Sequence, residues 1–149
     1  MKESALLRYA KSSELMDISL VINGDKIKFN LFKELVINPN ILNRELRDQS
    51  ISHSFLVIAH KNMVKSLSDH ELEVKRYTAK KWTDLKGGEG RQTKDDLRQR
   101  IEADPRYIMM QKKSIKLTYQ KDILEACIRS FEQRSSMLQT LSANTRRSL

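Results

Sequence analysis

The sequence has little of three residue types that mark whole classes of protein. Its 149 residues include one cysteine, two prolines and four glycines. A single cysteine excludes an intramolecular disulfide framework, so a reducing, cytoplasmic compartment is expected. The scarcity of glycine and proline argues against a turn-rich all-β sandwich and against a low-complexity chain. No run of about 18 apolar residues is present, so we predict no membrane partner.

The chain does have a surplus of positive charge, with 28 Lys and Arg against 19 Asp and Glu and a formal net charge of +9. This surplus is uneven, because residues 1–74 are neutral whereas residues 75–100 carry nine basic and four acidic side chains. A concentrated surplus predicts a polyanionic partner more than it predicts a fold. A solvated helix face has the same pattern, so charge alone leaves both interpretations open.

Apolar residues alternate over 17–31 on both sides of Asn23-Gly24. Asn-Gly favours the type I′ turn, so this alternation predicts a small β-hairpin. Helical spacing of apolar residues predicts a short helix over residues 1–14. We assign both elements to an N-terminal appendage, residues 1–39.

Residues 40–149 are predicted to form a helical domain. Apolar side chains from Leu56 to Tyr77 recur at steps of three and four, which is typical of a coiled coil or helical hairpin. The cluster Gly87-Gly88-Glu89-Gly90 then ends the helix, and Thr93 is a plausible N-cap for its successor. Pro105 suits the first turn of a second long helix, predicted over 105–143. The apolar stripe of that helix comprises Ile108, Ile115, Tyr119, Ile123, Cys127, Phe131, Leu138 and Leu141. The predicted fold is mainly α, a long antiparallel helical hairpin with a basic glycine-rich turn.

No residue constellation indicates catalysis. The glycine cluster lacks the Lys and the Ser or Thr of a phosphate-binding loop. His53, His60 and His70 have no Cys or carboxylate at zinc-ligand spacing. Cys127 lies in an apolar stripe, which favours a small core residue over a nucleophile. We therefore predict a non-enzymatic protein that needs no cofactor and no metal.

Basic and aromatic residues occur together between residues 75 and 100. Single-stranded nucleic acid requires cations for its phosphates and flat rings for its bases. The candidate binding residues are Lys75, Arg76, Lys80, Lys81, Trp82, Lys86 and Arg91. Tyr77 and Trp82 equally fit the end of the helical seam, and that alternative stays open. A protomer with few phosphate contacts binds weakly at physiological salt, whereas a ring of protomers multiplies those contacts.

From about Glu34 to its C-terminus the sequence resembles the UvsY-like family of phage recombination mediators. The order and spacing of several segments carry the resemblance, since no single segment is specific. They are Leu35-Val36-Ile37-Asn38, Tyr77-Thr78-Ala79-Lys80-Lys81-Trp82, Ile101-Glu102-Ala103-Asp104 and Ile128-Arg129-Ser130-Phe131-Glu132-Gln133-Arg134-Ser135. Residues 1–33 have no counterpart in this pattern, so the resemblance gives them no role.

The resemblance implies a homo-oligomer that binds single-stranded DNA and helps a phage recombinase displace single-strand-binding protein in the host cytoplasm. In that family, a Lys-x-Arg pair in the basic segment before the glycine turn is associated with DNA binding. Ala79-Lys80-Lys81-Trp82 stands at that place here, so Lys80 and Lys81 are the candidates that carry over. The family's C-terminal helix is tied to oligomerisation, which implies an intersubunit face of Ile123, Cys127, Phe131, Arg134 and Leu138.

Two alternatives remain at the level of the sequence. One is a structural helical-hairpin protein, a scaffold or adaptor whose basic stretch serves solubility. The other is an RNA-binding chaperone, because nothing in the sequence reports recognition of the 2′-hydroxyl group.

Overall fold

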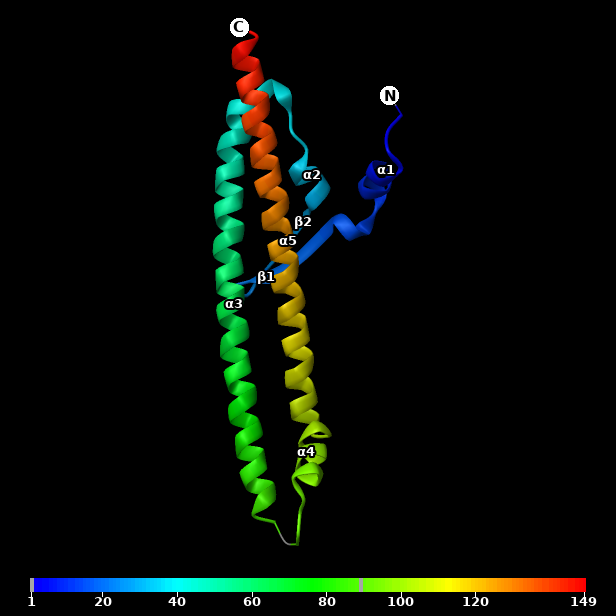
Figure 1. The fold of residues 1–149 in the computed structure, drawn as a ribbon, viewed down its shortest axis with the longest axis vertical. Helices are drawn as coiled ribbons and strands as arrows, with labels where there is room; N and C mark the ends of the chain where they lie inside the picture. The colour runs from blue at the N-terminus through cyan, green and yellow to red at the C-terminus, as the bar shows by residue number, and fades with distance from the viewer. Residues whose placement is uncertain (1, 89) are drawn as a thin grey trace. The chain divides into compact units, whose positions relative to one another are not determined.

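The computed structural model describes residues 2–88 and 90–149, so Glu89 of the predicted glycine turn lies outside the described residues. The chain divides into two compact units. Unit 1 comprises Met1–Lys61 and Ile123–Leu149, and unit 2 comprises Asn62–Asp122. Two long helices, α3 (Leu42–Lys86) and α5 (Pro105–Arg147), each contribute a segment to both units (Figure 1). The predicted mainly α fold is confirmed, and the domain boundary at residue 39 stays a prediction.

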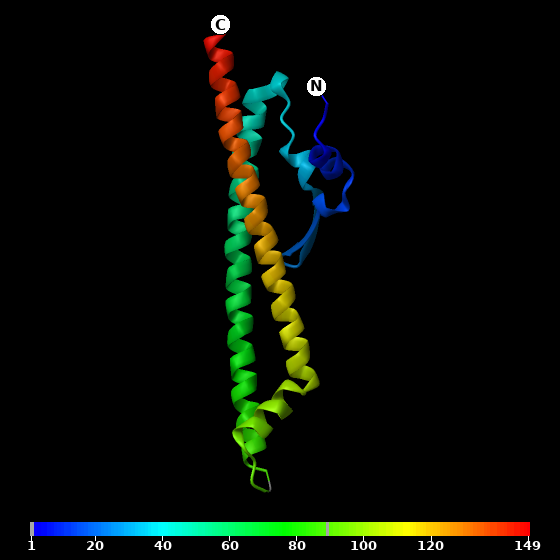
Figure 2. The same ribbon diagram turned by 45° about the vertical axis from the view of Figure 1, so that its right-hand side comes forward.

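The predicted β-hairpin is present in unit 1 (Figure 2). Strands β1 (Asp17–Ile22) and β2 (Asp25–Asn30) pair antiparallel, with Ile22 opposite Asp25. The two turn residues between them have positive φ, 52° at Asn23 and 85° at Gly24, as a type I′ turn requires. One face of β1 is buried through Ile18, Leu20 and Ile22. The hairpin therefore packs its apolar face inside unit 1.

A short helix, α1 (Ala5–Ser12), precedes the hairpin, as the sequence predicts, although it is shorter than residues 1–14. Ser4 caps it by accepting a hydrogen bond from the Leu7 N–H. The 3-10 helix η1 (Glu14–Met16) connects α1 to β1. No residue of α1 is buried.

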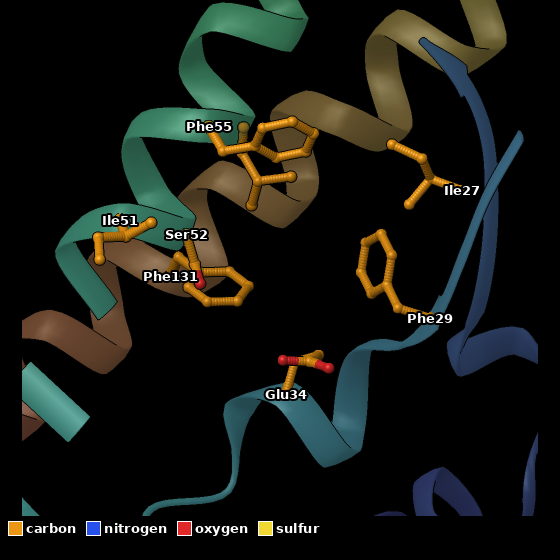
Figure 3. A pocket seen from close by; sticks show the side chains of 8 residues that line it. Ile27, Phe29, Glu34, Ile51, Ser52, Phe55 and Phe131 are labelled. Carbon is orange, nitrogen blue, oxygen red and sulfur yellow. The ribbon is translucent and has the colours of Figure 1, made fainter. Parts of the chain in front are cut away.

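Unit 1 also contains α2 (Leu31–Leu35) and the 3-10 helix η2 (Pro39–Ile41). Its segments of α3 and α5 run antiparallel, side by side (Figures 1 and 2). Beside them lies an apolar groove of about 340 Å³ that receives side chains from the hairpin, α2, α3 and α5 (Figure 3). Its lining is Ile27, Phe29, Glu34, Ile51, Ser52, Phe55, Leu56 and Phe131.

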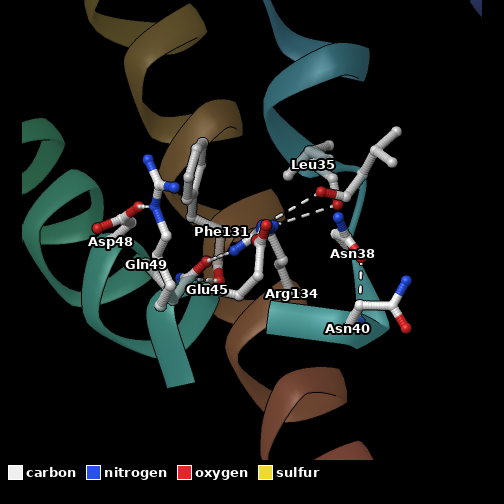
Figure 4. Close-up of polar contacts among 10 residues, drawn as sticks. Leu35, Asn38, Asn40, Glu45, Asp48, Gln49, Phe131 and Arg134 are labelled. Atoms are coloured by element: carbon white, nitrogen blue, oxygen red, sulfur yellow. Dashed lines mark hydrogen bonds and ion pairs between the residues drawn. The ribbon is translucent and has the colours of Figure 1, made fainter. Parts of the chain in front are cut away.

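A buried polar network joins α5 to the N-terminal part of unit 1 (Figure 4). Arg134 donates hydrogen bonds to the carbonyl oxygens of Leu35 and Val36, both at 3.2 Å. It also donates to Gln49 Oε1 at 3.0 Å and forms an ion pair with Glu45. Buried charges are stable only when paired and hydrogen-bonded, and this guanidinium meets both conditions.

In unit 2, the segments of α3 and α5 also lie antiparallel. Met63, Leu67 and His70 of α3 are buried, which confirms the predicted seam there. His70 Nε2–H donates to the Met110 carbonyl of α5 at 2.8 Å. Helix α4 (Lys94–Glu102) follows the glycine turn and buries Leu97 and Ile101.

The predicted start of α4 is confirmed by a capping box. Thr93 Oγ1 accepts from the Asp96 N–H, and the Asp96 carboxylate accepts from the Thr93 N–H. Helix α5 begins at Pro105, as predicted, and runs to Arg147 rather than to residue 143.

The predicted apolar stripe of α5 is wrong at four of its eight residues. Ile108, Ile115 and Tyr119 of unit 2 are exposed, with 70% of Ile115 accessible, and so is Leu141 of unit 1. Leu124 and Leu138, both fully buried, are two heptads apart, and successive heptad steps back from Leu124 lead to Leu117 and Met110. Leu117, Met110 and Ser114 are half-buried, and Gln120 is buried. A steady heptad phase, not local hydrophobicity, decides which face of a paired helix is buried.

Candidate nucleic-acid interface

An open groove of about 530 Å³ lies in unit 2 between the end of α3 and the start of α5. Arg76 and Lys80 stand four residues apart on α3 and therefore share a helix face. Lys81 and Arg106 add two further cations to the same groove. Its complete lining is Glu73, Arg76, Tyr77, Lys80, Lys81, Asp84, Arg106 and Met110.

Asp104 organises one wall of this groove. Its carboxylate accepts a hydrogen bond from Tyr77 Oη and lies 3.6 Å from Lys81 Nζ. Asp104 Oδ1 also accepts a hydrogen bond from the backbone N–H of Arg106 at 3.1 Å, so Asp104 caps the start of α5. The hydrogen bond from Tyr77 lowers the pKa of Asp104 and raises the pKa of Tyr77. Asp104 is therefore held ionised, and the phenol is held protonated.

Arg106 completes the cationic wall, and it is not among the binding residues predicted from the sequence. Its guanidinium carbon lies 4.9 Å from the centroid of the Tyr77 ring, a cation–π geometry. Only the antiparallel return of α5 brings it beside α3, so no local pattern identifies it. The guanidinium therefore covers one face of the Tyr77 ring.

The cations of the groove differ in how they are paired. Lys81 has Asp104 as its partner. Among the described residues, Arg76, Lys80 and Arg106 form no ion pair with a carboxylate. Glu73 and Asp84 lie at the groove as well, so its lining holds four cations and two acidic side chains, with Asp104 behind them. The groove is therefore net positive and open to an anionic ligand.

The structure gathers only part of the predicted binding set. Arg76, Lys80 and Lys81 line the groove. The other four predicted residues do not line it: Lys75, Lys86 and Arg91 are exposed elsewhere, and Trp82 is half-buried. A role for those four in binding stays a prediction.

The predicted oligomerisation residues lie mostly inside one protomer. Cys127, Phe131 and Leu138 are at most 4% exposed, Arg134 belongs to the buried network, and Ile123 is half-buried. Burial also raises the pKa of the Cys127 thiol. Packing within unit 1 already accounts for these apolar residues, so their part in an intersubunit face stays a prediction.

Among the described residues, none of the helices combines the length and the apolar character that crossing a bilayer needs. Residues 2–88 and 90–149 hold no cluster of three or more His, Cys, Asp or Glu side chains arranged to bind a metal ion.

The fold matches a known structure. The crystal structure of the recombination mediator protein UvsY of bacteriophage T4 superposes with a TM-score of 0.68, over 80% of this chain and 93% of that chain. The two sequences are 13% identical, so the match shows a shared fold and confirms the predicted resemblance at that level. No protein-family model matches the sequence, and no curated protein matches it either.

Proposed function

We propose that this protein is a non-enzymatic recombination mediator that binds single-stranded DNA as a homo-oligomer. It promotes loading of a phage recombinase in place of single-strand-binding protein, in the cytoplasm of the host cell. Two findings support the proposal. The fold is shared with a phage recombination mediator. The observation in this chain that carries it is the convergence of Arg76, Lys80, Lys81 and Arg106 on one open groove.

The groove suits a flexible polyanion better than a compact ligand. Its cations come from two helices and it is open, so a strand can enter and leave along it. Each phosphate neutralised on a single strand contributes about −0.7 to the slope of log affinity against log salt. Four cations on one protomer therefore bind weakly, and several protomers on one strand gain avidity.

The groove is tested with the double substitution Lys80→Ala and Lys81→Ala. We expect weaker binding of single strands of any sequence, and a salt slope that is shallower by about 1.4, because two phosphate contacts are lost. The double substitution Lys112→Ala and Lys113→Ala is the matched control, because it removes the same charge from exposed positions of unit 2 outside the groove. If the two double variants weaken binding equally, only the net charge matters, and the groove is not the binding site for single strands.

The mediator activity needs its own measurement. A cognate phage recombinase is assayed for filament formation on single strands covered with single-strand-binding protein. The wild-type protein should shorten the lag before filament growth, and the Lys80→Ala, Lys81→Ala protein should not. If both proteins shorten the lag equally, recombinase loading does not depend on DNA binding in the groove.

The alternatives predict different results in the same experiments. A scaffold or adaptor would sediment as a multimer and show no salt-sensitive binding of oligonucleotides. An RNA-binding chaperone would prefer RNA to DNA of the same sequence.

A further inference from the structure

Asp104, beside the cationic groove of unit 2, is fixed in place through both of its carboxylate oxygens. Oδ2 accepts a hydrogen bond from Tyr77 Oη, and Oδ1 accepts one from the backbone N–H of Arg106 at 3.1 Å. The Asp104 side chain is 11% exposed, whereas that of its ion-pair partner Lys81 is 37% exposed. A lysine has a long flexible stem, so Lys81 is the partner that is free to leave the pair.

The contact between Lys81 and Asp104 is a loose one. Lys81 Nζ lies 3.6 Å from Asp104 Oδ2, which is longer than an ordinary hydrogen bond. Ion pairs that reach solvent contribute little to stability, so Lys81 exchanges its partner at small cost.

A phosphate oxygen is an anionic acceptor of the same kind as a carboxylate oxygen, and it therefore seeks the same ammonium group. A phosphate that reaches Lys81 either displaces Asp104 from it or lies beside Asp104. In both cases the negative charge of the carboxylate opposes the phosphate. That charge is permanent at neutral pH, because the hydrogen bond from Tyr77 lowers the pKa of Asp104.

Lys81 differs in this respect from the other cations of the groove. Among the described residues, Arg76, Lys80 and Arg106 form no ion pair with a carboxylate. The opposition by Asp104 is therefore directed at one of the four cations and leaves the other three available to a strand.

We propose that Asp104 is an internal competitor of the DNA strand, because its carboxylate occupies Lys81 in the empty groove and lowers the affinity of the groove for phosphate. This role rests on the proposed function, since it concerns the same groove and the same ligand. Asp104 then has two separable parts, as hydrogen-bond acceptor at the start of α5 and as negative charge beside Lys81. Weaker binding at each protomer suits a protein that has to release the strand to a recombinase.

The substitution Asp104→Asn separates the two parts. Asparagine is a good N-cap residue and keeps an oxygen for the Arg106 N–H, while its amide group is able to donate to Tyr77 Oη and carries no charge. We expect the variant to bind single-stranded oligonucleotides about three- to fivefold more tightly at low salt, the gain that corresponds to releasing one partly exposed ion pair. Fluorescence anisotropy titrations measure the affinity.

Asp122→Asn is the matched control. The Asp122 carboxylate also lies 3.6 Å from a lysine, Lys121, and this pair is in unit 2 but outside the groove. The substitution changes the net charge by the same amount and also frees a lysine, yet it should tighten binding by less than about 1.5-fold, because salt screens charges away from the strand. Equal gains in the two variants would overturn the proposal, since net charge alone would explain them.

A double-mutant cycle tests whether Asp104 acts through Lys81. In the Lys81→Ala protein, Asp104→Asn should tighten binding by less than about twofold, because no ammonium group is left to release. A gain as large as in the protein with Lys81 would mean that Asp104 does not compete for this lysine.

Circular dichroism checks that the variants are folded, and Asp104→Ser provides a second uncharged N-cap residue at the same position. Suppose that wild-type protein binds strands in a salt-sensitive way and that neither folded Asp104 variant binds more tightly. Asp104 is then no competitor, and the proposed function stands. Absence of any binding by the wild-type protein would instead refute DNA binding in the groove and, with it, the role of Asp104.

Discussion

At the scale of single residues, Arg134 shows how one side chain can join distant segments. Arg134 belongs to α5. Its guanidinium donates hydrogen bonds to two backbone carbonyls that precede α3, and it contacts the side chains of Glu45 and Gln49 on α3. Arg129, five residues earlier on α5, is paired among the described residues only with the exposed Glu125, at 3.0 Å. The two arginines therefore differ in burial while sharing a helix and a charge.

Replacing Arg134 should lower the free energy of unfolding far more than replacing Arg129. We expect Arg134→Ala to lower the free energy of unfolding by about 3–5 kcal/mol, because Glu45 is left partly buried without its cation. Arg129→Ala should cost less than about 1 kcal/mol, as surface ion pairs do. Urea unfolding followed by circular dichroism measures both. A similar loss in the two variants would mean that the network does not hold unit 1 together.

Tyr77 should ionise at a higher pH than an ordinary tyrosine. Its hydrogen bond to Asp104 raises its pKa, so this bond stabilises the fold below the ordinary tyrosine pKa and the contribution is lost as pH rises through the raised value. Absorbance of tyrosinate during alkaline titration should show one late step. Tyr77→Phe should remove that step, whereas Tyr119→Phe should leave it. A late step that survives Tyr77→Phe would contradict the assignment.

The same bond lowers the pKa of Asp104, so its contribution acts in the opposite direction on the acid side. It is present above the ordinary carboxyl pKa and is lost as pH falls through the lowered value. The wall of the groove is consequently intact across the neutral range.

At the scale of elements, the turn of the β-hairpin depends on a backbone conformation that side chains disfavour. Gly24 has φ of +85°, and a Cβ atom there would meet no atom within 4 Å. Strain, not crowding, would therefore be the cost of a substitution. Gly87, at the end of α3, has no such φ, and a Cβ there would be in ordinary contact at 3.7 Å.

Gly24→Ala should destabilise the protein by about 1–2 kcal/mol, the cost of placing an L-residue in the left-handed region. Gly87→Ala is the control and should change the free energy of unfolding by less than about 0.5 kcal/mol. Thermal or urea unfolding distinguishes them. If Gly24→Ala is neutral, the hairpin contributes little to the stability of unit 1.

At the scale of the whole molecule, the chain leaves much apolar surface uncovered for its size. Exposed faces occur on α1, on the unit 1 segment of α3 and on the unit 2 segment of α5. Large exposed apolar patches mark interaction surfaces in soluble proteins. The proposed assembly of this protein with itself and with other proteins would use such surfaces.

Deleting residues 2–12 should leave the stability of the protomer almost unchanged. Because α1 buries no residue, the free energy of unfolding should change by less than about 0.5 kcal/mol, measured by urea unfolding at low protein concentration. A loss of more than about 1 kcal/mol at low concentration would show that α1 stabilises its own protomer.

Local patterns of the sequence predict those elements whose cause is local. Asn23-Gly24 and the alternation around it predict the hairpin, and Thr93 and Pro105 predict two helix starts. The phase of α5 in unit 2 is different. Ile115 is among the most apolar residues there, yet it is 70% exposed, whereas Leu117 and Met110, in heptad register with the buried Leu124, are half-buried. Hydrophobicity in a short window does not contain that information.

The amino-acid sequence by itself determined the helical class, the hairpin and the basic segment of α3, because periodicity, turn chemistry and charge act between near neighbours. Only the tertiary structure decided that Arg106 joins Lys80 and Lys81, and that Arg134 is buried with Glu45. These contacts join residues separated by at least 25 positions. Their geometry follows from how the segments of α3 and α5 pair within each unit, which depends on packing between residues far apart in the sequence.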